Sequence, residues 1–147
     1  MSLALKKDEL DAYLGEVFAH VWSDFEIDAL TPDGVSVRLL ANPRHVRPGG
    51  TVSGPAMFAL SDVAVYAAVL ARVGRMALAV TTNCSIDFMR KPSVDRDLIA
   101  DCRLLKMGRV LAVGDVLMFS DGDERPVARA SLTYSIPPQG SNAALAG

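Results

Sequence analysis

The stretch "GPAMFALSDVAVYAAVLARVG", residues 54–74, decides the fold of this 147-residue chain. Pro55 occupies the expected first helical position, where its missing N–H is tolerated, and Gly74 is a residue type that commonly ends helices. Nearly every side chain between them is apolar, so no helical spacing yields a polar face. A helix that is apolar all round must be surrounded, and we therefore predict a buried central helix over residues 55–73.

Asp62 interrupts this run as a single acidic side chain near the middle of residues 55–71. A carboxylate is rarely buried unless another group pairs with it. In a membrane span, a central aspartate costs about 2.5–3.5 kcal/mol on insertion scales, and a run this short lies at the lower length limit. We therefore expect a soluble protein in which Asp62 either performs chemistry or forms a structural salt bridge with an arginine.

Further elements flank the central helix on both sides. Residues 8–22 place apolar side chains at helical spacing, which predicts an N-terminal surface helix. Residues 26–41 indicate a hairpin with its turn at Pro32-Asp33-Gly34. Alternating apolar residues and turn signals predict four more strands, at residues 76–90, 98–107, 109–120 and 126–136.

Short connections between these strands predict an antiparallel meander that curls around the central helix. The fold class is therefore α+β, in a single domain over residues 1–147 with a frayed tail from about residue 138. The first of the four strands alternates between two faces, with Leu78, Val80, Cys84, Ile86 and Phe88 on one and Thr81, Asn83, Ser85 and Asp87 on the other.

Composition narrows the class of protein. Half of the residues are hydrophobic and 22% are charged, as in ordinary globular domains. A net charge of −2 provides no electrostatic footprint for nucleic acid or an anionic membrane. Cys84 and Cys102 lack the spacing of a metal site or a disulfide framework, so we expect two small core residues in a cytoplasmic protein. Neither a metal nor a separate cofactor is expected.

Three motifs agree with this order of elements. "RPGGTVSGPAMFALSD" (47–62) leads through a Gly-Gly step into a helix with an acid about two turns in, "FMRKP" (88–92) ends a strand, and Gly108-Arg109 makes a "GR" turn. In these features, and over roughly residues 30–137, the chain resembles the hotdog-fold thioesterases, specifically the small acyl-CoA thioesterases of the phenylacetate-degradation (PaaI-like) type. The resemblance implies a hotdog fold and hydrolysis of an acyl-CoA thioester, with coenzyme A as part of the substrate.

The resemblance also implies roles for three residues. Asp62 falls at the acidic catalytic position, where the family's residue acts as nucleophile or as general base on water. Gly54 falls at the glycine whose backbone N–H polarises the thioester carbonyl, and Thr81 lies near a Ser or Thr position that helps to place the water. Elementary chemistry agrees, since free N–H groups at a helix start stabilise developing negative charge and a desolvated carboxylate suits general-base work.

Two departures from the family pattern affect the loop before the helix. Where many relatives carry Asn or His at its start, this chain has Arg47, and the familiar His-Gly-Gly step reads Ser53-Gly54-Pro55. Apolar side chains on the helix predict an apolar acyl pocket. Basic groups predict substrate contacts, with a solvated surface role as the alternative for each: Arg47, His45, Arg90 and Lys91, of which the last two would meet the coenzyme A phosphates.

Two other functions remain open at this point. An acyl-CoA-binding module without catalysis would fit the absence of the family's Asn and His. A hydratase or dehydratase would pair a His with an acid, but His45 precedes Asp62 by 17 residues across a Gly-rich loop, which is a poor match. Open sheet edges predict a homo-oligomer, and the resemblance implies a homodimer joined edge to edge, with the site between subunits and dimers commonly paired.

Overall fold

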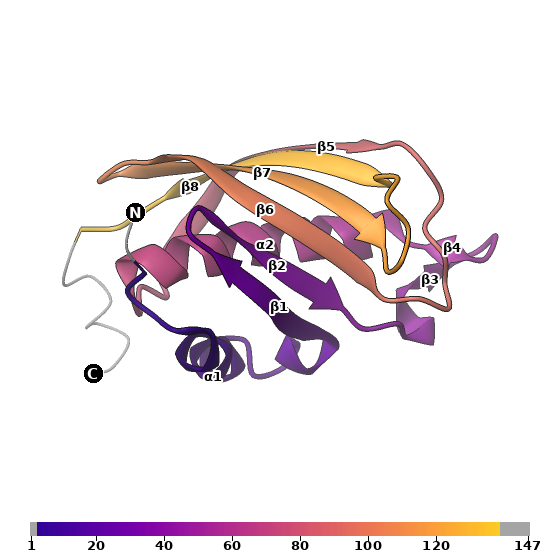
Figure 1. The fold of residues 1–147 in the computed structure, drawn as a ribbon, viewed down its shortest axis with the longest axis horizontal. Helices are drawn as coiled ribbons and strands as arrows, with labels where there is room; N and C mark the ends of the chain where they lie inside the picture. Colours follow the sequence, from indigo (N-terminus) through magenta and orange to yellow (C-terminus); the bar gives the residue numbers. More distant parts are fainter. Residues whose placement is uncertain (1–2, 139–147) are drawn as a thin grey trace.

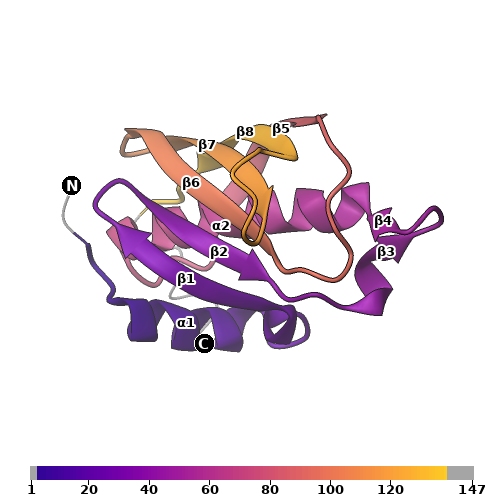
Figure 2. The same ribbon diagram turned by 45° about the vertical axis from the view of Figure 1, so that its right-hand side comes forward.

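A long helix, α2, runs along the inner face of a curved antiparallel sheet (Figures 1 and 2). The structure is a computed structural model that describes residues 3–138, so the predicted frayed tail lies almost entirely outside the described residues. The elements in chain order are α1 (Lys7–Val17), β1 (Phe25–Thr31), β2 (Gly34–Leu39), β3 (Val46–Arg47), β4 (Thr51–Val52), α2 (Gly54–Val73), β5 (Val80–Phe88), β6 (Leu98–Met107), β7 (Leu111–Ser120) and β8 (Ala128–Ser135), with 3₁₀ turns at Trp22–Asp24 and Pro43–His45.

The central helix is capped at both ends by its sequence. Ser53 Oγ accepts a hydrogen bond from the N–H of Ala56 at 3.2 Å, so the helix begins at Gly54 and Pro55 takes its second position, one later than predicted. Gly74 ends it with φ at 89°, a conformation that favours glycine. By length and composition α2 could span a membrane, but 78% of its apolar window is buried inside the protein. The prediction of a buried central helix is confirmed.

The sheet has the strand order β1-β2-β6-β7-β8-β5, with every neighbouring pair antiparallel. The predicted α+β architecture is confirmed, as are the β1–β2 hairpin and a meander through β6, β7 and β8. β5 departs from the meander because it pairs with β8 at the edge of the sheet. The connection over residues 89–97 is long enough to carry the chain from this edge across to β6 (Figure 1).

A β-bulge changes which side chains of β5 face the helix. The pairing with β8 shifts register between Thr81 and Asn83, and one extra residue reverses the alternation of faces. Thr81 therefore points toward α2, and Val80 is 56% exposed. The predicted alternation is correct after the bulge, where Cys84 and Ile86 pack against the core, and wrong before it.

The N-terminal helix is shorter than the predicted range of 8–22, because α1 ends at Val17. Trp22 folds back toward α1, where its Nε1–H donates to Asp11 at 3.2 Å, and its ring stacks on Phe25 with centroids 5.9 Å apart. Both contacts require the chain to leave the helix axis after Phe18. α1 then packs beside β1, as Figure 2 shows.

A short hairpin, β3–β4, precedes α2 and was not predicted. Its turn contains Gly49 and Gly50, both with positive φ, which explains the Gly-Gly step in the sequence. The N–H of Ser53 donates to the carbonyl of His45 at 2.7 Å, so the residue just before β3 is tied to the N-cap of the helix. The hairpin thereby lies at the N-terminal end of α2 (Figure 1).

Candidate active site

Two hydroxyl groups hold the carboxylate of Asp62. Thr81 Oγ1 donates to Asp62 Oδ1 at 2.5 Å, and the Tyr134 hydroxyl donates to the same oxygen at 2.7 Å. Within residues 3–138, no basic side chain pairs with Asp62, so the alternative of a structural salt bridge to an arginine is wrong. We call Asp62, Thr81 and Tyr134 the carboxylate cluster. No other described group bonds to the carboxylate, which leaves Oδ2 without a protein partner.

The strand register explains why these hydroxyls meet. Thr81 and Tyr134 are direct cross-strand partners on β5 and β8; the bulge after Thr81 turns Thr81 toward α2, and the regular alternation of β8 already points Tyr134 there. Burial, reinforced by the negative charge of Asp62, raises the pKa of Tyr134 above its usual range. Tyr134 consequently keeps its proton and acts as a donor toward the half-buried carboxylate.

Two other nucleophile types lie close to Asp62 but are poorly suited to attack. Burial, and secondarily the charge of Asp62, raises the pKa of the Cys84 thiol, so Cys84 stays protonated near neutral pH. Ser61 is fully buried, and its hydroxyl donates to the carbonyl of Phe58 at 2.8 Å. Of these three groups, Asp62 is therefore the one that is able to act as a base or nucleophile.

The second predicted site residue, Gly54, lines a cavity of about 500 Å³ at the N-terminus of α2. The N–H of Gly54 has no hydrogen-bond partner among the described residues, and a Cβ added there would lie 3.4 Å from the Phe88 ring. We call this hollow the cationic cavity, and its lining residues are Arg47, Thr51, Val52, Gly54, Met57, Phe88, Met89, Arg90, Lys91 and Pro92.

Three predicted substrate contacts converge on the cationic cavity. Arg47 comes from β3, whereas Arg90 and Lys91 follow the end of β5. Arg90 donates to the carbonyl of Pro126 at 2.9 Å, and none of the three forms an ion pair within residues 3–138. Cations without acidic partners around a hollow, beside a free helix N-terminus, make a suitable site for an anion.

His45 does not line the cationic cavity. Its Nε2 lies 3.6 Å from a carboxylate oxygen of Asp24, which also pairs with Arg44. The contribution of His45 to the loop comes from its backbone carbonyl, which accepts from Ser53. The structure therefore brings Arg47, Arg90 and Lys91 together with Gly54 and places the side chain of His45 elsewhere.

The carboxylate cluster and the cationic cavity are separate in one chain. Asp62 lies eight positions after Gly54, or about 12 Å along the helix axis at 1.5 Å per residue. The residues that line the cationic cavity do not include Asp62, Thr81 or Tyr134. One substrate would have to reach both, either along α2 or with help from a second subunit.

Comparison with known proteins identifies the family of the chain. A family model described as "Thioesterase superfamily" matches residues 49–127, which include Gly54, Asp62 and Thr81. This chain belongs to the thioesterase superfamily. A crystal structure of a "putative thioesterase" from a Silicibacter species is 62% identical, with a TM-score of 0.88, and the match covers 94% of this chain and 96% of that one.

More distant structures share the fold of this thioesterase. Zebra fish thioesterase superfamily member 2 has a TM-score of 0.81 at 20% identity, covering 91% of this chain and 100% of its own. A mutant of the phenylacetic acid degradation protein PaaI from Thermus thermophilus has a TM-score of 0.68 at 21% identity, covering 86% and 99%. Among curated proteins none matches. The hotdog fold and the likeness to thioesterases are confirmed, and with them thioester hydrolysis as the general activity.

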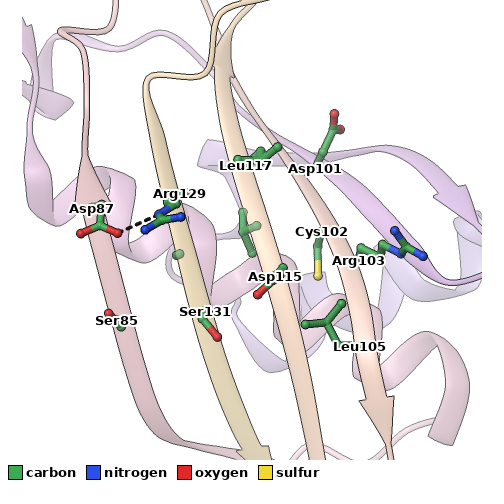
Figure 3. A pocket seen from close by; sticks show the side chains of 12 residues that line it. Ser85, Asp87, Asp101, Cys102, Arg103, Leu105, Asp115, Leu117, Arg129 and Ser131 are labelled. Carbon is green, nitrogen blue, oxygen red and sulfur yellow. Dashed lines mark hydrogen bonds and ion pairs between the residues drawn. The ribbon is translucent and has the colours of Figure 1, made fainter.

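A further hollow of about 580 Å³ lies on the outer face of the thioesterase's sheet (Figure 3). The view shows α2 behind the strands, with Ser85, Asp87, Arg129 and Ser131 on the side away from the helix. Arg129 pairs with Asp87 at 2.8 Å. None of the predicted site residues lines this hollow. Among residues 3–138, no group of three His, Cys, Asp or Glu side chains could hold a metal ion.

Tyr134 is the site residue that sequence reasoning missed in this thioesterase. The pattern of residues 126–136 does contain a signal, because alternation sets Tyr134 on the same inward face as Ala130 and Leu132. A buried tyrosine usually needs a partner for its hydroxyl. Asp62, the one acid in the central helix, was the obvious partner to test.

Proposed function

We propose that this thioesterase hydrolyses an acyl-CoA thioester to a free acid and coenzyme A. The observation that carries the proposal is the carboxylate of Asp62, held through Oδ1 by Thr81 and Tyr134 while Oδ2 has no protein partner among residues 3–138. A carboxylate fixed in this way can take a proton from water or attack the carbonyl carbon itself.

The two routes share the same balance of bonds. In the general-base route, water adds to the thioester carbon while Asp62 accepts its proton; the C–S bond then breaks and the thiolate of coenzyme A takes up a proton. In the nucleophilic route, Oδ2 forms an anhydride with the acyl group, the thiolate leaves, and water opens the anhydride. Both routes place negative charge on the carbonyl oxygen, which the free N–H of Gly54 would stabilise.

The cationic cavity supplies the proposed binding site for coenzyme A. Arg47, Arg90 and Lys91 have no acidic partners among residues 3–138. The negative phosphates of the substrate would serve as their counter-charges. Coenzyme A is part of the substrate, and no other cofactor or metal is proposed. The side chain of His45 faces Asp24, which makes it a poor candidate for direct contact.

A homodimer would bring the two separate parts together. Among the described residues β5 is an edge strand with one side unpaired, and Val80, Phe88 and Met89 are exposed along or just beyond it. If two copies of β5 pair antiparallel about a twofold axis between Cys84 and Ser85, Thr81 of one subunit comes level with Phe88 of the other. Thr81 touches Asp62 and Phe88 lies beside Gly54, so each Asp62 would face Gly54 of the partner subunit.

We further propose that two dimers associate and that the protein is cytoplasmic. Leu117 and Leu105 are exposed on the outer face of the sheet, which gives a second surface through which dimers could associate. Light scattering at micromolar concentration should give a mass of at least two chains. A monomeric mass would contradict the shared site.

A panel of acyl-CoA substrates, with detection of the free thiol, tests the proposed activity directly. Release of coenzyme A supports hydrolysis. A change in enoyl absorbance without thiol release would instead identify a hydratase or dehydratase. Saturable binding of acyl-CoA with no turnover would identify a binding module. The size of the preferred acyl group follows from the same panel.

A further inference from the structure

We infer that Tyr134 is a positioning residue, which orients the carboxylate of Asp62 so that Oδ2 is the oxygen that reacts. The inference rests on the proposed function and deepens it. Its starting point is the contact between the Tyr134 hydroxyl and Asp62, 2.7 Å from Oδ1 and 3.1 Å from the backbone carbonyl of the same residue. A hydroxyl has one proton to donate, and the carboxylate is the stronger acceptor at the shorter distance.

The ring of Tyr134 is fixed in place by its surroundings. It is 3% exposed, and its centroid lies 6.0 Å from that of Tyr66, one helical turn after Asp62 on the same face of α2. Tyr66 is itself held, because its hydroxyl donates to the carbonyl of Ala77 at 2.9 Å. A donor on a rigid ring fixes the carboxylate more tightly than one on a mobile side chain would.

The donor is also permanent. Burial and the charge of Asp62 raise the pKa of Tyr134, so the hydroxyl is protonated throughout the range in which thioesters can be assayed. Two donors on Oδ1 restrict rotation of the carboxylate, and they leave Oδ2 as the oxygen that is not engaged by the β5–β8 ladder. A tyrosine that only filled the core would need its ring alone.

Tyr134→Phe separates the two roles because it keeps the ring and removes the hydroxyl. We expect kcat to fall about tenfold with little change in KM, the scale of one hydrogen bond to a charged group. Tyr13→Phe is the matched control, since Tyr13 lies on α1 beneath the guanidinium of Arg75, and it should change neither quantity.

The outcomes distinguish this inference from the proposed function. If Asp62→Asn abolishes hydrolysis while Tyr134→Phe keeps the wild-type kcat, the inference is overturned and the function stands. If Asp62→Asn is fully active, the function assigned to Asp62 fails instead. Crystal structures of the wild type and of Tyr134→Phe give a readout independent of activity. A rotated or disordered Asp62 carboxylate in the variant is expected, and an unchanged orientation would overturn the inference.

Discussion

The carboxylate cluster and the cationic cavity lie on the same helix but are built in opposite ways. In the cluster, Asp62 is half-buried and two neutral hydroxyls satisfy one of its oxygens, so its geometry is complete within the chain. In the cavity, the N–H of Gly54 and the charges of Arg47 and Lys91 have no partner within residues 3–138.

This difference assigns a separate task to each region. A carboxylate fixed by two hydroxyl donors is prepared for a chemical step, and its removal should lower kcat. Free cations around an open hollow lack a counter-charge until a ligand brings one, and their removal should raise KM. Gly54 belongs to both tasks: its N–H lies in the cationic cavity, where the substrate would bind, but would act on the reacting carbonyl.

Asp62→Asn should produce the largest effect. The amide oxygen can still accept from Thr81 and Tyr134, so the fold should survive, while hydrolysis should fall by about 10²-fold or more. The matched control is Asp87→Asn, which alters an exposed aspartate on the outer side of the same sheet, paired with Arg129. Turnover by both variants, with circular dichroism as the check on folding, tests the prediction. Near-wild-type turnover by Asp62→Asn would show that the carboxylate cluster does not perform the chemical step.

Gly54→Val should lower turnover by roughly 10²-fold, the scale for one oxyanion donor. The branched side chain would occupy the space between the helix start and Phe88, where the thioester is proposed to lie. Gly54→Ala is the control, because its single Cβ would sit at ordinary contact distance from that ring, and it should retain activity within several-fold. An active Gly54→Val enzyme would show that the carbonyl is held elsewhere.

Arg47→Ala and Lys91→Ala should each raise KM up to about tenfold and leave kcat nearly unchanged, because both remove a charge-assisted contact to phosphate. KM of the wild type should also increase with salt. Arg125→Ala, which breaks an exposed pair with Asp123 instead, is the control. If Arg47→Ala lowers kcat, then Arg47 acts on the reacting group in place of the Asn found in the family.

The smallest effect should appear in the alkaline pH profile. The pKa of Tyr134 is raised above the usual value for tyrosine, so its proton stays in place as the pH rises from about 8 to 10. We therefore expect kcat to remain flat over this range after subtraction of spontaneous hydrolysis. A decline that is present in the wild type and absent in Tyr134→Phe would mean that the donor is lost within the range.

The sequence predicts the parts of this site that depend on local pattern. An apolar run between a proline and a glycine was enough to place α2, and a lone acid within it identified Asp62. The edge position of β5 was not predictable, because pairing with β8 is a long-range contact with no local signal. The bulge that turns Thr81 inward also belongs to this long-range pairing and likewise has no local signal. The contact between Thr81 and Asp62 depends on both, and so the complete cluster emerges only in three dimensions.

Subunit mixing tests most directly whether the two regions meet across a pair of β5 edges. Asp62→Asn and Gly54→Val proteins, each inactive alone, would be unfolded together and refolded as mixed dimers. If each site combines Asp62 of one subunit with Gly54 of its partner, half of the dimers are mixed and one of their two sites is intact, so about a quarter of the wild-type activity should return. No recovery, with mixed dimers demonstrated by mass spectrometry, would place both residues in one chain's site and contradict the account.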